Sequence, residues 1–545
     1  MGNQITEVRL LAVPLENDYK HTLHFSGRGT QTQYFLSKSS PAYTYTNLSY
    51  QRKERYISVP GSYEDLRNFN YVMYRNRQNS MNDWRYAFIT RMEYKSDDVT
   101  WVYIETDVLQ TYLTDYTIKA SFVEREHTND DTAGKNTIPE NLECGEFVCH
   151  YLQEDSTLTA LSVVCAVSET DPQWLPSDNI FDVPDGPALG LRQYSGAVSG
   201  LLYLTYPIDQ LSKMSELVER YDEAGKADSI QAIFLCPSFL APGIEVGANN
   251  EPILHGMGAE PSSFEIDVGG GIANSVDSSY VPRNKKLLTY PFKYLMVSNN
   301  AGASAVYHYE LFDDKANSGM KFRVYGTLTP GCSIRMVPLN YKGVPENNEE
   351  GLNLGKLPIC NWTSDAFTNW LTQNSVNIGL TLATGATSVA VGAGATVLGA
   401  IGGFGIGATA GVGMIAGGVS SIANQLTQVH QMKFTPDQSR GNINSGDVTT
   451  AMNKNTFTVY GMSIKTEYAE IIDGFFDMFG YKVNRVKVPF SNHRPEYWYT
   501  KTIDVSIDGN VPSDDMQKIK DCYNRGVTFW KNPENIGDYS VNNKI

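Results

Sequence analysis

The sequence has little of what an enzyme or a nucleic-acid-binding protein needs. It contains 44 Lys and Arg against 60 Asp and Glu, which gives a formal net charge of −16. Basic side chains neutralise phosphates when a protein grips nucleic acid, so this acidic balance argues against that class of protein. The eight histidines are few for a metalloenzyme of 545 residues, and no pair of them has the HExxH spacing.

The seven cysteines form no recognisable disulfide framework. Their number is odd and their spacing is irregular, so we expect reduced, mostly buried thiols and synthesis in a cytosol. Cys144, Cys149 and His150 are close in sequence, as are His21 and His24. Neither group has the further ligands that a zinc site requires. The first residues also lack the basic region and the uninterrupted apolar run of a secretory signal.

Motifs with catalytic spacing are missing as well. A Gly-Lys pair occurs at positions 134, 225 and 355 but is never followed by Ser or Thr, which excludes a Walker loop. Glu124, Glu126, Arg125 and His127 form one short polar run. We interpret this run as a solvated charge cluster at a strand end rather than as an acid–base site. The sequence therefore predicts no enzyme, no cofactor and no metal site.

Aromatic and β-branched residues, in contrast, are abundant. The chain has 33 Tyr, and such residues favour strands over helices. Residues 101–105 alternate in polarity only weakly, because both faces of this run carry apolar groups. Such a strand is packed on two sides or lies at a subunit interface. We predict a mainly β protein with some α-helix, which is an α+β fold class.

Changes in composition divide the chain into five segments. Runs of strand-forming residues alternate with polar or Gly- and Pro-containing clusters, and one segment stands out by its lack of charge. The predicted segments are a β-rich N-terminal part at 1–170, a mixed α/β insertion at 171–285, a β-rich return at 286–365, a charge-free hydrophobic segment at 366–432, and an α+β C-terminal domain at 433–545.

Three helices are expected outside the charge-free segment, of which the first is amphipathic. The first has an apolar face made by Leu211, Met214, Leu217, Val218 and Tyr221. The second follows residue 465 and is closed by Gly480, which suits a left-handed C-terminal position. The third has Ser513 as its N-cap, two carboxylates in its first turn and Gly526 at its end.

The charge-free segment 366–432 is 67 residues long. Within it, residues 391–418 contain eleven glycines and no charged residue, Asn or Gln. A helix that crosses a bilayer needs about 20 apolar residues. Residues 380–419 are therefore long enough to cross as a helical hairpin with two arms.

The glycines of this segment are spaced for helix contacts. Gly399, Gly403, Gly407 and Gly411 recur every four residues, so on a helix they form a groove that a second helix can approach closely. Each glycine costs a helix in water about 1 kcal/mol relative to alanine, which makes the helix conditional on lipid. Bulky residues for the lipid-facing side are Leu380, Val397, Leu398, Ile401, Phe404, Ile406, Val412, Met414, Ile415 and Val419.

Three other interpretations of the segment are weaker. A pair of buried core helices rarely tolerates so much glycine. A linker would be rich in Ser and other polar residues rather than in Val, Ile and Met. A permanent membrane anchor usually carries flanking Lys or Arg and interfacial Trp or Tyr, whereas the flanks here are neutral and polar. We therefore interpret the segment as conditionally membrane-active.

Long stretches elsewhere in the chain resemble one known family. Residues 107–131, 468–489 and 526–540 are similar to the tail knob proteins of small short-tailed phages of Gram-positive bacteria, the phi29-like group. The resemblance brackets almost the whole chain, and it is weakest over residues 173–350.

The resemblance implies a homohexameric tube at the distal end of the virion tail, synthesised in the host cytoplasm. Its β-rich domains form a ring, and one long hydrophobic loop per subunit plugs the lumen until infection. The loops, here residues 380–419, then form a pore in the host cytoplasmic membrane through which DNA passes. The implied partners are other copies of the chain, other tail and collar proteins, membrane lipids, and phage DNA that passes without specific binding.

Two alternative functions stay open at this point. One is a cell-wall hydrolase associated with the tail. The other is a bacterial surface or secretion component that is anchored in the membrane.

Overall fold

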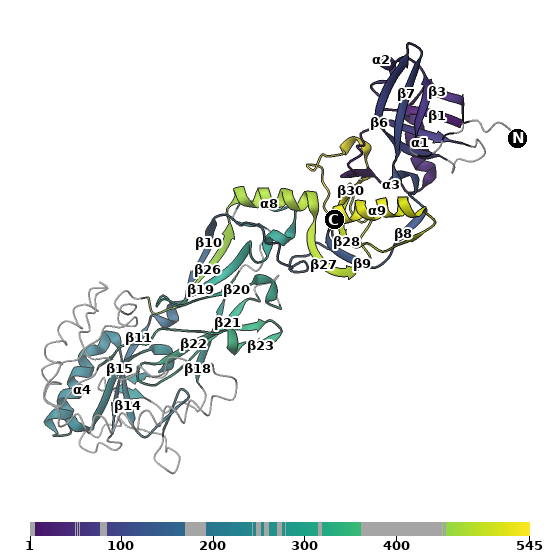
Figure 1. Ribbon diagram of the computed structural model, residues 1–545. Coiled ribbons are helices and arrows are strands. Elements are labelled where there is room, and N and C mark those ends of the chain that lie inside the picture. Colours follow the sequence, from purple (N-terminus) through teal and green to yellow (C-terminus); the bar gives the residue numbers. More distant parts are fainter. Residues whose placement is uncertain are drawn as a thin grey trace, which may run out of the picture. The chain divides into compact units, whose positions relative to one another are not determined.

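The chain forms two compact units, each built from segments that are discontinuous in the sequence (Figure 1). Unit 1 comprises Met1–Glu146, Asn274–Pro291 and Lys465–Ile545, and unit 2 comprises Phe147–Ala273 and Phe292–Ile464. The chain therefore passes four times between the units. The computed structural model describes residues 6–49, 51, 53, 55–76, 84–168, 192–241, 244–246, 252–254, 261–269, 275–277, 279–313, 319–360, 450 and 454–545.

The first sheet of unit 1 is antiparallel and has the strand order β3-β1-β5-β6-β7-β4. Its strands are β1 (Thr6–Leu11), β3 (Ser39–Leu48), β4 (Tyr56–Pro60), β5 (Tyr71–Arg75), β6 (Arg85–Ser96) and β7 (Val99–Thr106). On β7, Val102 and Ile104 are buried on one face. On the other face Trp101 stacks on Tyr56, with 4.0 Å between the ring centroids. The predicted apolar character of both faces of this strand is therefore confirmed.

The second sheet of unit 1 joins strands from the two ends of the chain. Its order is β2-β30-β28-β9-β27, in which β2 is parallel to β30 and the other neighbours are antiparallel. Its strands are β2 (His21–Leu23), β9 (Ser121–Glu126), β27 (Tyr481–Lys487), β28 (Tyr497–Ile503) and β30 (Val527–Trp530). A short ladder of β8 (Tyr116–Ile118) and β29 (Ile507–Gly509) also joins early and late residues.

Aromatic side chains fill the core that these elements share with the helices of unit 1. Phe35 stacks on Tyr71 with 5.4 Å between ring centroids, and Tyr497 packs against Trp530 at 4.4 Å. Such rings bury large apolar areas and gain further from their pairwise geometry. In the described residues, the α-helices of unit 1 are α1 (Arg28–Ser37), α2 (Tyr63–Leu66), α3 (Val108–Thr111), α8 (Thr466–Phe479) and α9 (Ser513–Arg525).

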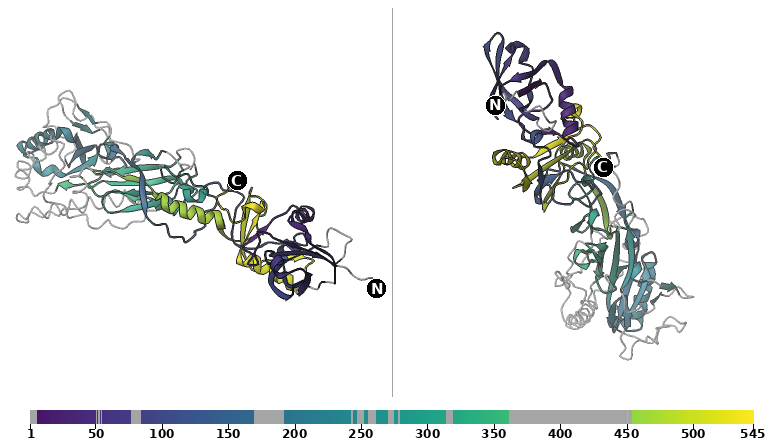
Figure 2. Two further views of the ribbon diagram at one scale, coloured as in Figure 1. Left: turned by 90° about the horizontal axis from the view of Figure 1, so that it is seen from above. Right: turned by 90° about the vertical axis from the view of Figure 1, so that its right-hand side faces the viewer.

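Unit 2 is built from antiparallel sheets and the helix α4 (Leu211–Glu223); Figure 2 shows its blue-green to teal strands from two sides. The sheet orders are β10-β26-β19-β20, β14-β11-β15-β25 and β18-β21-β22-β23, with β24 also paired to β22. Their strands are β10 (Phe147–Glu154), β11 (Leu161–Val167), β14 (Leu202–Pro207), β15 (Ile230–Pro237), β18 (Ser262–Asp267), β19 (Lys293–Ser298), β20 (Ser304–Tyr307), β21 (Lys321–Thr327), β22 (Ser333–Tyr341), β23 (Val344–Glu346), β24 (Leu352–Asn353), β25 (Ile359–Cys360) and β26 (Thr458–Ile464). The described part of unit 2 also contains the hairpins β12 (Arg192–Tyr194)–β13 (Ala197–Ser199) and β16 (Ile244–Val246)–β17 (Pro252–Leu254).

The mainly β prediction and the three expected helices are confirmed. Helix α4 buries Met214, Leu217, Val218 and Tyr221 on one face. Helix α8 ends at Gly480, where φ is 63° and the backbone N–H donates to the carbonyl of Phe476. The five segments predicted from composition stay a prediction. They are consecutive stretches of the sequence, whereas the two compact units group residues by contact and combine stretches that are distant in sequence.

The N-cap predicted for α9 was wrong by one residue. Ser513 is the first residue of the helix, and Pro512 precedes it with an extended backbone at φ −55° and ψ 144°. Proline fixes φ near this value, so it sets the direction in which the helix starts. The predicted end of the helix at Gly526 is confirmed by its φ of 97°.

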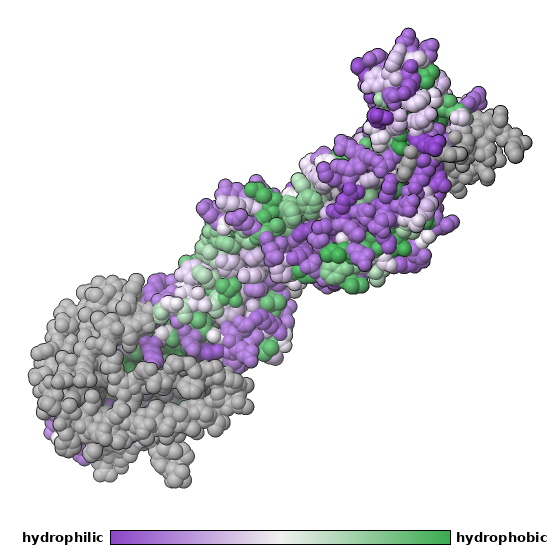
Figure 3. All heavy atoms as spheres, viewed as in Figure 1, coloured by the Kyte–Doolittle hydropathy of each residue, from purple (hydrophilic) through white to green (hydrophobic). Residues whose placement is uncertain are grey.

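The visible surface of unit 1 is mostly hydrophilic, but an apolar patch lies over β9 and β27 (Figure 3). The register pairs Val486 and Ile503 with Phe122 from either side, so the three side chains form one row. Val488 is a fourth exposed apolar residue next to this row. Within the described ranges, no helix is both long enough and apolar enough to span a bilayer.

Replacing Gly480 by alanine is expected to lower the free energy of unfolding of unit 1 by more than about 1 kcal/mol. An added Cβ would lie 2.2 Å from the carbonyl oxygen of Glu126, and φ is positive. Gly474 on the same helix has no atom within 4 Å of such a Cβ. Gly474→Ala is the matched control and should stabilise the protein by about 0.5–1 kcal/mol. Chemical denaturation monitored by Trp fluorescence measures both; equal effects of the two substitutions would contradict the prediction.

Candidate functional site: the anchors of the charge-free segment

The residues predicted to be membrane-active lie outside the described part of the chain. This holds for the glycines Gly399, Gly403, Gly407 and Gly411. It holds equally for the bulky residues Leu380, Val397, Leu398, Ile401, Phe404, Ile406, Val412, Met414, Ile415 and Val419. What the structure does define is the chain on either side of the segment, up to residue 360 and again from residue 454.

On the N-terminal side the segment follows β25. This short strand pairs with β15 at Ile233 and Phe234, and Phe234 is 1% exposed. Just before it, the backbone N–H of Leu357 donates to the carbonyl of Gly331 at 3.1 Å, and the Leu357 side chain is fully buried. The carbonyl of Pro358 accepts a hydrogen bond from Leu235 N at 3.1 Å. The chain just before the segment, residues 357–360, is therefore held by strand pairing and by the buried side chain of Leu357.

On the C-terminal side the chain enters the core through Phe457 and the strand β26. Phe457 is 0% exposed, and β26 is an inner strand that pairs with β10 on one side and β19 on the other. Phe457, Leu357 and Phe234 belong to the same hydrophobic cluster. The described residues that precede and follow the charge-free segment are thus fixed in one core of unit 2.

Asn300 fastens the turn that leads into β26. Its Nδ2 donates to the carbonyl of Thr456 at 3.0 Å and to Thr458 Oγ1 at 3.0 Å, with a longer contact of 3.4 Å to the carbonyl of Lys454. The Asn300 backbone has φ of 54°, a left-handed conformation that asparagine tolerates better than most residues. One amide side chain therefore holds the chain at three residues, Lys454, Thr456 and Thr458.

Polar contacts from β10 complete this anchor. Lys454 Nζ lies 2.7 Å from Glu154 Oε1, and Thr456 Oγ1 donates to the carbonyl of Asp155 at 2.8 Å. Thr458 Oγ1 also donates to Glu154 Oε1 at 3.3 Å. The Lys454–Glu154 pair is partly exposed, so its own contribution is small. The buried hydrogen bonds are what fix the backbone.

The sheet β10-β26-β19-β20 has two open edges in the described part of the chain. β10 and β20 each have one strand neighbour there. Both carry an exposed apolar side chain: Leu152 on β10 is 58% exposed and Val306 on β20 is 43% exposed. An open edge with apolar side chains is a template for pairing with another chain.

The polar run at residues 124–127 differs from its prediction. Glu126 and His127 are buried at 0% and 3% exposure, so the expected solvated cluster was wrong for these two residues. Glu126 forms an ion pair with Lys487 and accepts a hydrogen bond from Phe490 N. β9 lies between two other strands, and this inner position, which the sequence does not reveal, buries the end of the run.

The candidate metal ligands are engaged in other contacts. Cys144 and Cys149 are free thiols. Trp530 Nε1 donates to His21 Nδ1 at 3.1 Å, and His24 packs edge-on against Trp498. Among the residues that the structure describes, no three His, Cys, Asp or Glu side chains are grouped so as to hold a metal ion.

Sequence reasoning missed the residues that anchor the segment. Asn300, Glu154 and Asp155 lie far from it in sequence, and none belongs to a recognisable motif. The only available signal was the Asn-Asn-Ala-Gly run at 299–302, which predicts a turn but does not indicate what the turn contacts.

Asn300→Ala should destabilise unit 2 by about 2–4 kcal/mol, because it removes the donor from buried oxygens and places alanine at a left-handed position. Asn141 has a similar φ of 56° and an exposed side chain. Asn141→Ala therefore serves as the control for backbone strain alone. Thermal unfolding followed by circular dichroism compares the two variants. A loss no larger than that of the control would show that the hydrogen bonds of Asn300 are unimportant.

Comparison with known proteins gives matches along the whole chain. The family described as the C-terminal domain of tail knob protein gp9 of Bacillus phage phi29 matches residues 261–544. The family described as the N-terminus of caudoviral major tail proteins matches residues 4–117.

Curated relatives and a solved structure agree with these matches. The tail knob proteins gp9 of Bacillus phages phi29 and PZA are each 26% identical to this chain, over 99% of this chain and 98% of theirs. The structure of the tail knob protein gp12 of bacteriophage C1 superimposes with a TM-score of 0.64 at 14% identity, covering 99% of both chains. At that identity the structural likeness concerns the fold.

Proposed function

Because the chain belongs to the phi29 gp9 family of tail knob proteins, we propose that it forms the distal DNA-ejection tube of a phage tail and opens a membrane pore with residues 380–419. Its place as a structural protein of the virion tail follows from the family. The tube, the plug and the pore are the proposal. The observation that carries it is a charge-free segment of 67 residues whose described flanking residues, Leu357 before it and Phe457 after it, lie in one buried core.

The fixed residues on either side of the segment matter because, in this proposal, the segment moves from the lumen of the tube into a bilayer. Burying apolar surface yields roughly 25 cal/mol per Å², so this segment of 40 mostly apolar residues needs cover both before and after ejection. In the proposal, copies of the segment shelter one another in the lumen and later enter the bilayer. The Asn300 contacts and the β25–β15 pairing keep the segment attached to its unit during this exchange.

A ring of copies is supported by the edges of the sheet β10-β26-β19-β20. Four antiparallel strands are an even number, so β10 and β20 run in opposite directions. If β20 of one copy pairs with β10 of the next, every junction is antiparallel, like the pairs inside the sheet. Such a head-to-tail contact closes into a ring when the rotation between copies allows it. We propose a homohexamer that joins other tail and collar proteins.

An acidic chain suits a passage for DNA. The net charge of −16 repels phosphates, so DNA would slide through the lumen without specific binding. Synthesis in the host cytoplasm fits the free thiols of the chain. The two alternatives, a cell-wall hydrolase and a membrane-anchored surface component, have no specific contact in the described residues that favours them.

Deleting residues 380–419 should leave assembly intact and abolish the release of dye from liposomes. A finer test replaces Phe404 and Ile415 by Asp, because a charge at the bilayer centre costs about 2.5–3.5 kcal/mol per residue. We expect dye release to fall at least tenfold for this pair. Phe404→Leu with Ile415→Val is the matched control and should stay near the wild-type level. Undiminished leakage by the deletion would refute the pore.

Leu152→Lys combined with Val306→Lys should prevent closure of the ring, because charged side chains on edge strands block pairing. Mass photometry is expected to find a homohexamer for the wild-type chain of 60.5 kDa and smaller species for the variant. Ile545→Lys, at a site that is 61% exposed and lies outside the sheets, is the control. A double variant that still forms the full ring would rule out these edges as the contact.

A further inference from the structure

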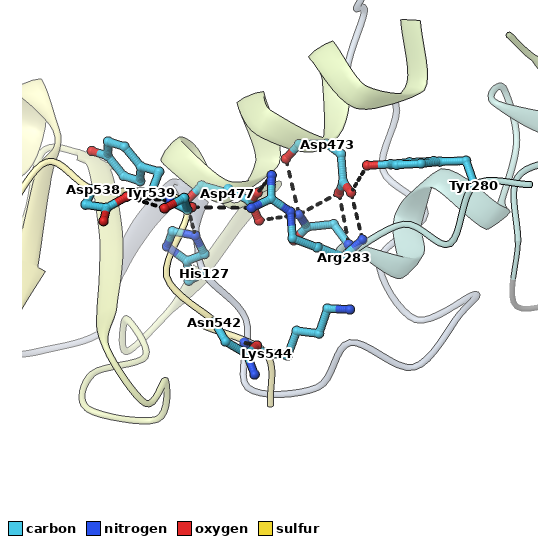
Figure 4. A network of polar contacts seen from close by, with 11 residues as sticks. His127, Tyr280, Arg283, Asp473, Asp477, Asp538, Tyr539, Asn542 and Lys544 are labelled. Atoms are coloured by element: carbon cyan, nitrogen blue, oxygen red, sulfur yellow. Dashed lines mark hydrogen bonds and ion pairs between the residues drawn. The ribbon is translucent and has the colours of Figure 1, made fainter. Parts of the chain in front are cut away.

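A second set of polar contacts, within unit 1, lies along α8 (Figure 4). Residues Asn274–Pro291 belong to unit 1, although the chain on either side of them belongs to unit 2. We call these residues the return segment. At the start of α8, Thr466 Oγ1 donates to Asp277 Oδ2 at 2.6 Å. Further along the helix, Asp473 and Asp477 bind the return segment at Tyr280, Arg283 and Asn284.

Asp473 is fully satisfied in this cluster. Its carboxylate is 0% exposed and accepts from Tyr280 Oη at 2.7 Å, Arg283 N at 2.7 Å, Asn284 N at 3.0 Å and Asn284 Nδ2 at 2.8 Å. Four donors replace the water that a carboxylate loses on burial. Two of these donors are backbone N–H groups, so Asp473 fixes the path of the return segment directly.

Asp477 lies one helical turn later and is less well supplied. Its Oδ1 accepts from Asn284 Nδ2 at 2.8 Å. Its buried Oδ2 accepts no hydrogen bond from the described residues and has an ion pair with Arg283 Nη2 at 2.5 Å. The side chain is 11% exposed. A second buried carboxylate beside Asp473 is thus held by one hydrogen bond and one ion pair, whereas Asp473 accepts four hydrogen bonds.

We propose that α8 and the return segment form a clasp that is closed most firmly when Asp477 carries a proton. A protonated Asp477 no longer repels Asp473, although its ion pair with Arg283 is weakened. Ionisation restores that ion pair, but the repulsion between two buried carboxylates and their lost hydration outweigh it, so the hydrogen bonds from Arg283 N and Asn284 N to Asp473 loosen. The inference concerns unit 1 and does not depend on the charge-free segment or on a pore.

The charged groups around Asp477 agree with this direction. Burial raises the pKa of Asp477 to about 6, opposed by Asn284, Arg283 and Arg494 and assisted by Asp473. From the side of β28, Tyr497 keeps its proton, because burial and then Asp477 raise its pKa. The carboxyl therefore binds its proton more tightly when the clasp is closed, so closure is firmest below the ordinary pKa of 3.8, weakens as the pH rises from there to about 6, and changes little above that.

His127, which also touches Asp477, does not titrate in this range. Tyr499 N donates to His127 Nδ1 at 2.7 Å, so Nε2 carries the ring proton and donates to the carbonyl of Asp477 at 3.0 Å. Burial first, and then the charge of Arg494, lower the pKa of His127 to about 3. The imidazole of His127 is therefore neutral and holds the C-terminal end of α8 through this hydrogen bond.

Hydrogen exchange of the full-length protein tests the clasp, because the N–H groups of Arg283 and Asn284 bond to Asp473. After correction for the intrinsic pH dependence of exchange, protection of residues 279–288 should fall by up to about 100-fold between pH 4 and pH 7.5. That factor corresponds to the difference between a pKa of about 6 and the ordinary 3.8.

Asp477→Asn and Asp473→Asn should have opposite effects on protection from hydrogen exchange. Asp477→Asn mimics the protonated carboxyl, so protection should be high and nearly independent of pH. Asp473→Asn removes an acceptor from two backbone N–H groups and should lower protection at every pH. Glu470→Gln, an exposed site on the same helix, should behave like the wild type. Wild-type protection that is constant or rises with pH would overturn the proposal, as would an unchanged pH dependence in Asp477→Asn.

Discussion

The pairing of β9 with two late strands is the interaction on which unit 1 depends. β9 holds residues 121–126, and its neighbours β27 and β28 hold residues from 481 onwards. Because β9 lies between them, neither flank of this sheet exists until the chain has returned from unit 2. The same pairing buries Glu126 and His127 and brings α8 next to the return segment. This sheet therefore forms only after the chain has run through unit 2 and returned to unit 1.

Buried carboxylates are the second device that joins distant parts of the chain in unit 1. Asp515 binds Tyr112 and Lys53, Glu140 binds Lys286 and Arg125, and Asp473 binds the return segment. A buried charge is costly unless hydrogen bonds replace its water, so each of these groups accepts only one arrangement of its partners. Apolar packing supplies most of the stability, whereas these carboxylates select which segments meet.

Local features of the sequence predicted local structure well. Gly480 and Gly526 mark the ends of their helices because only a residue without a side chain fits their backbone and their neighbours. The face of α4 follows from residue spacing. The polar run at 124–127 was misjudged, because burial of Glu126 depends on strands more than 350 residues away. The anchor at Asn300 was missed for the same reason: its partners are defined by the fold and not by spacing. The charge-free segment was found from composition alone, and its role stays a prediction.

The position of β30 close to the end of the chain affects the order of events during translation. Residues of unit 2 leave the ribosome between the first and last segments of unit 1. β9 therefore waits for its partners β27 and β28 while some 350 residues are made, which at typical elongation rates takes on the order of 20–70 seconds, and β2 waits for β30 over some 500 residues. Unit 2 has all of its strands before unit 1 does. A chain truncated before β30 lacks a strand of the second sheet of unit 1, so both units can form only after β30 has been made.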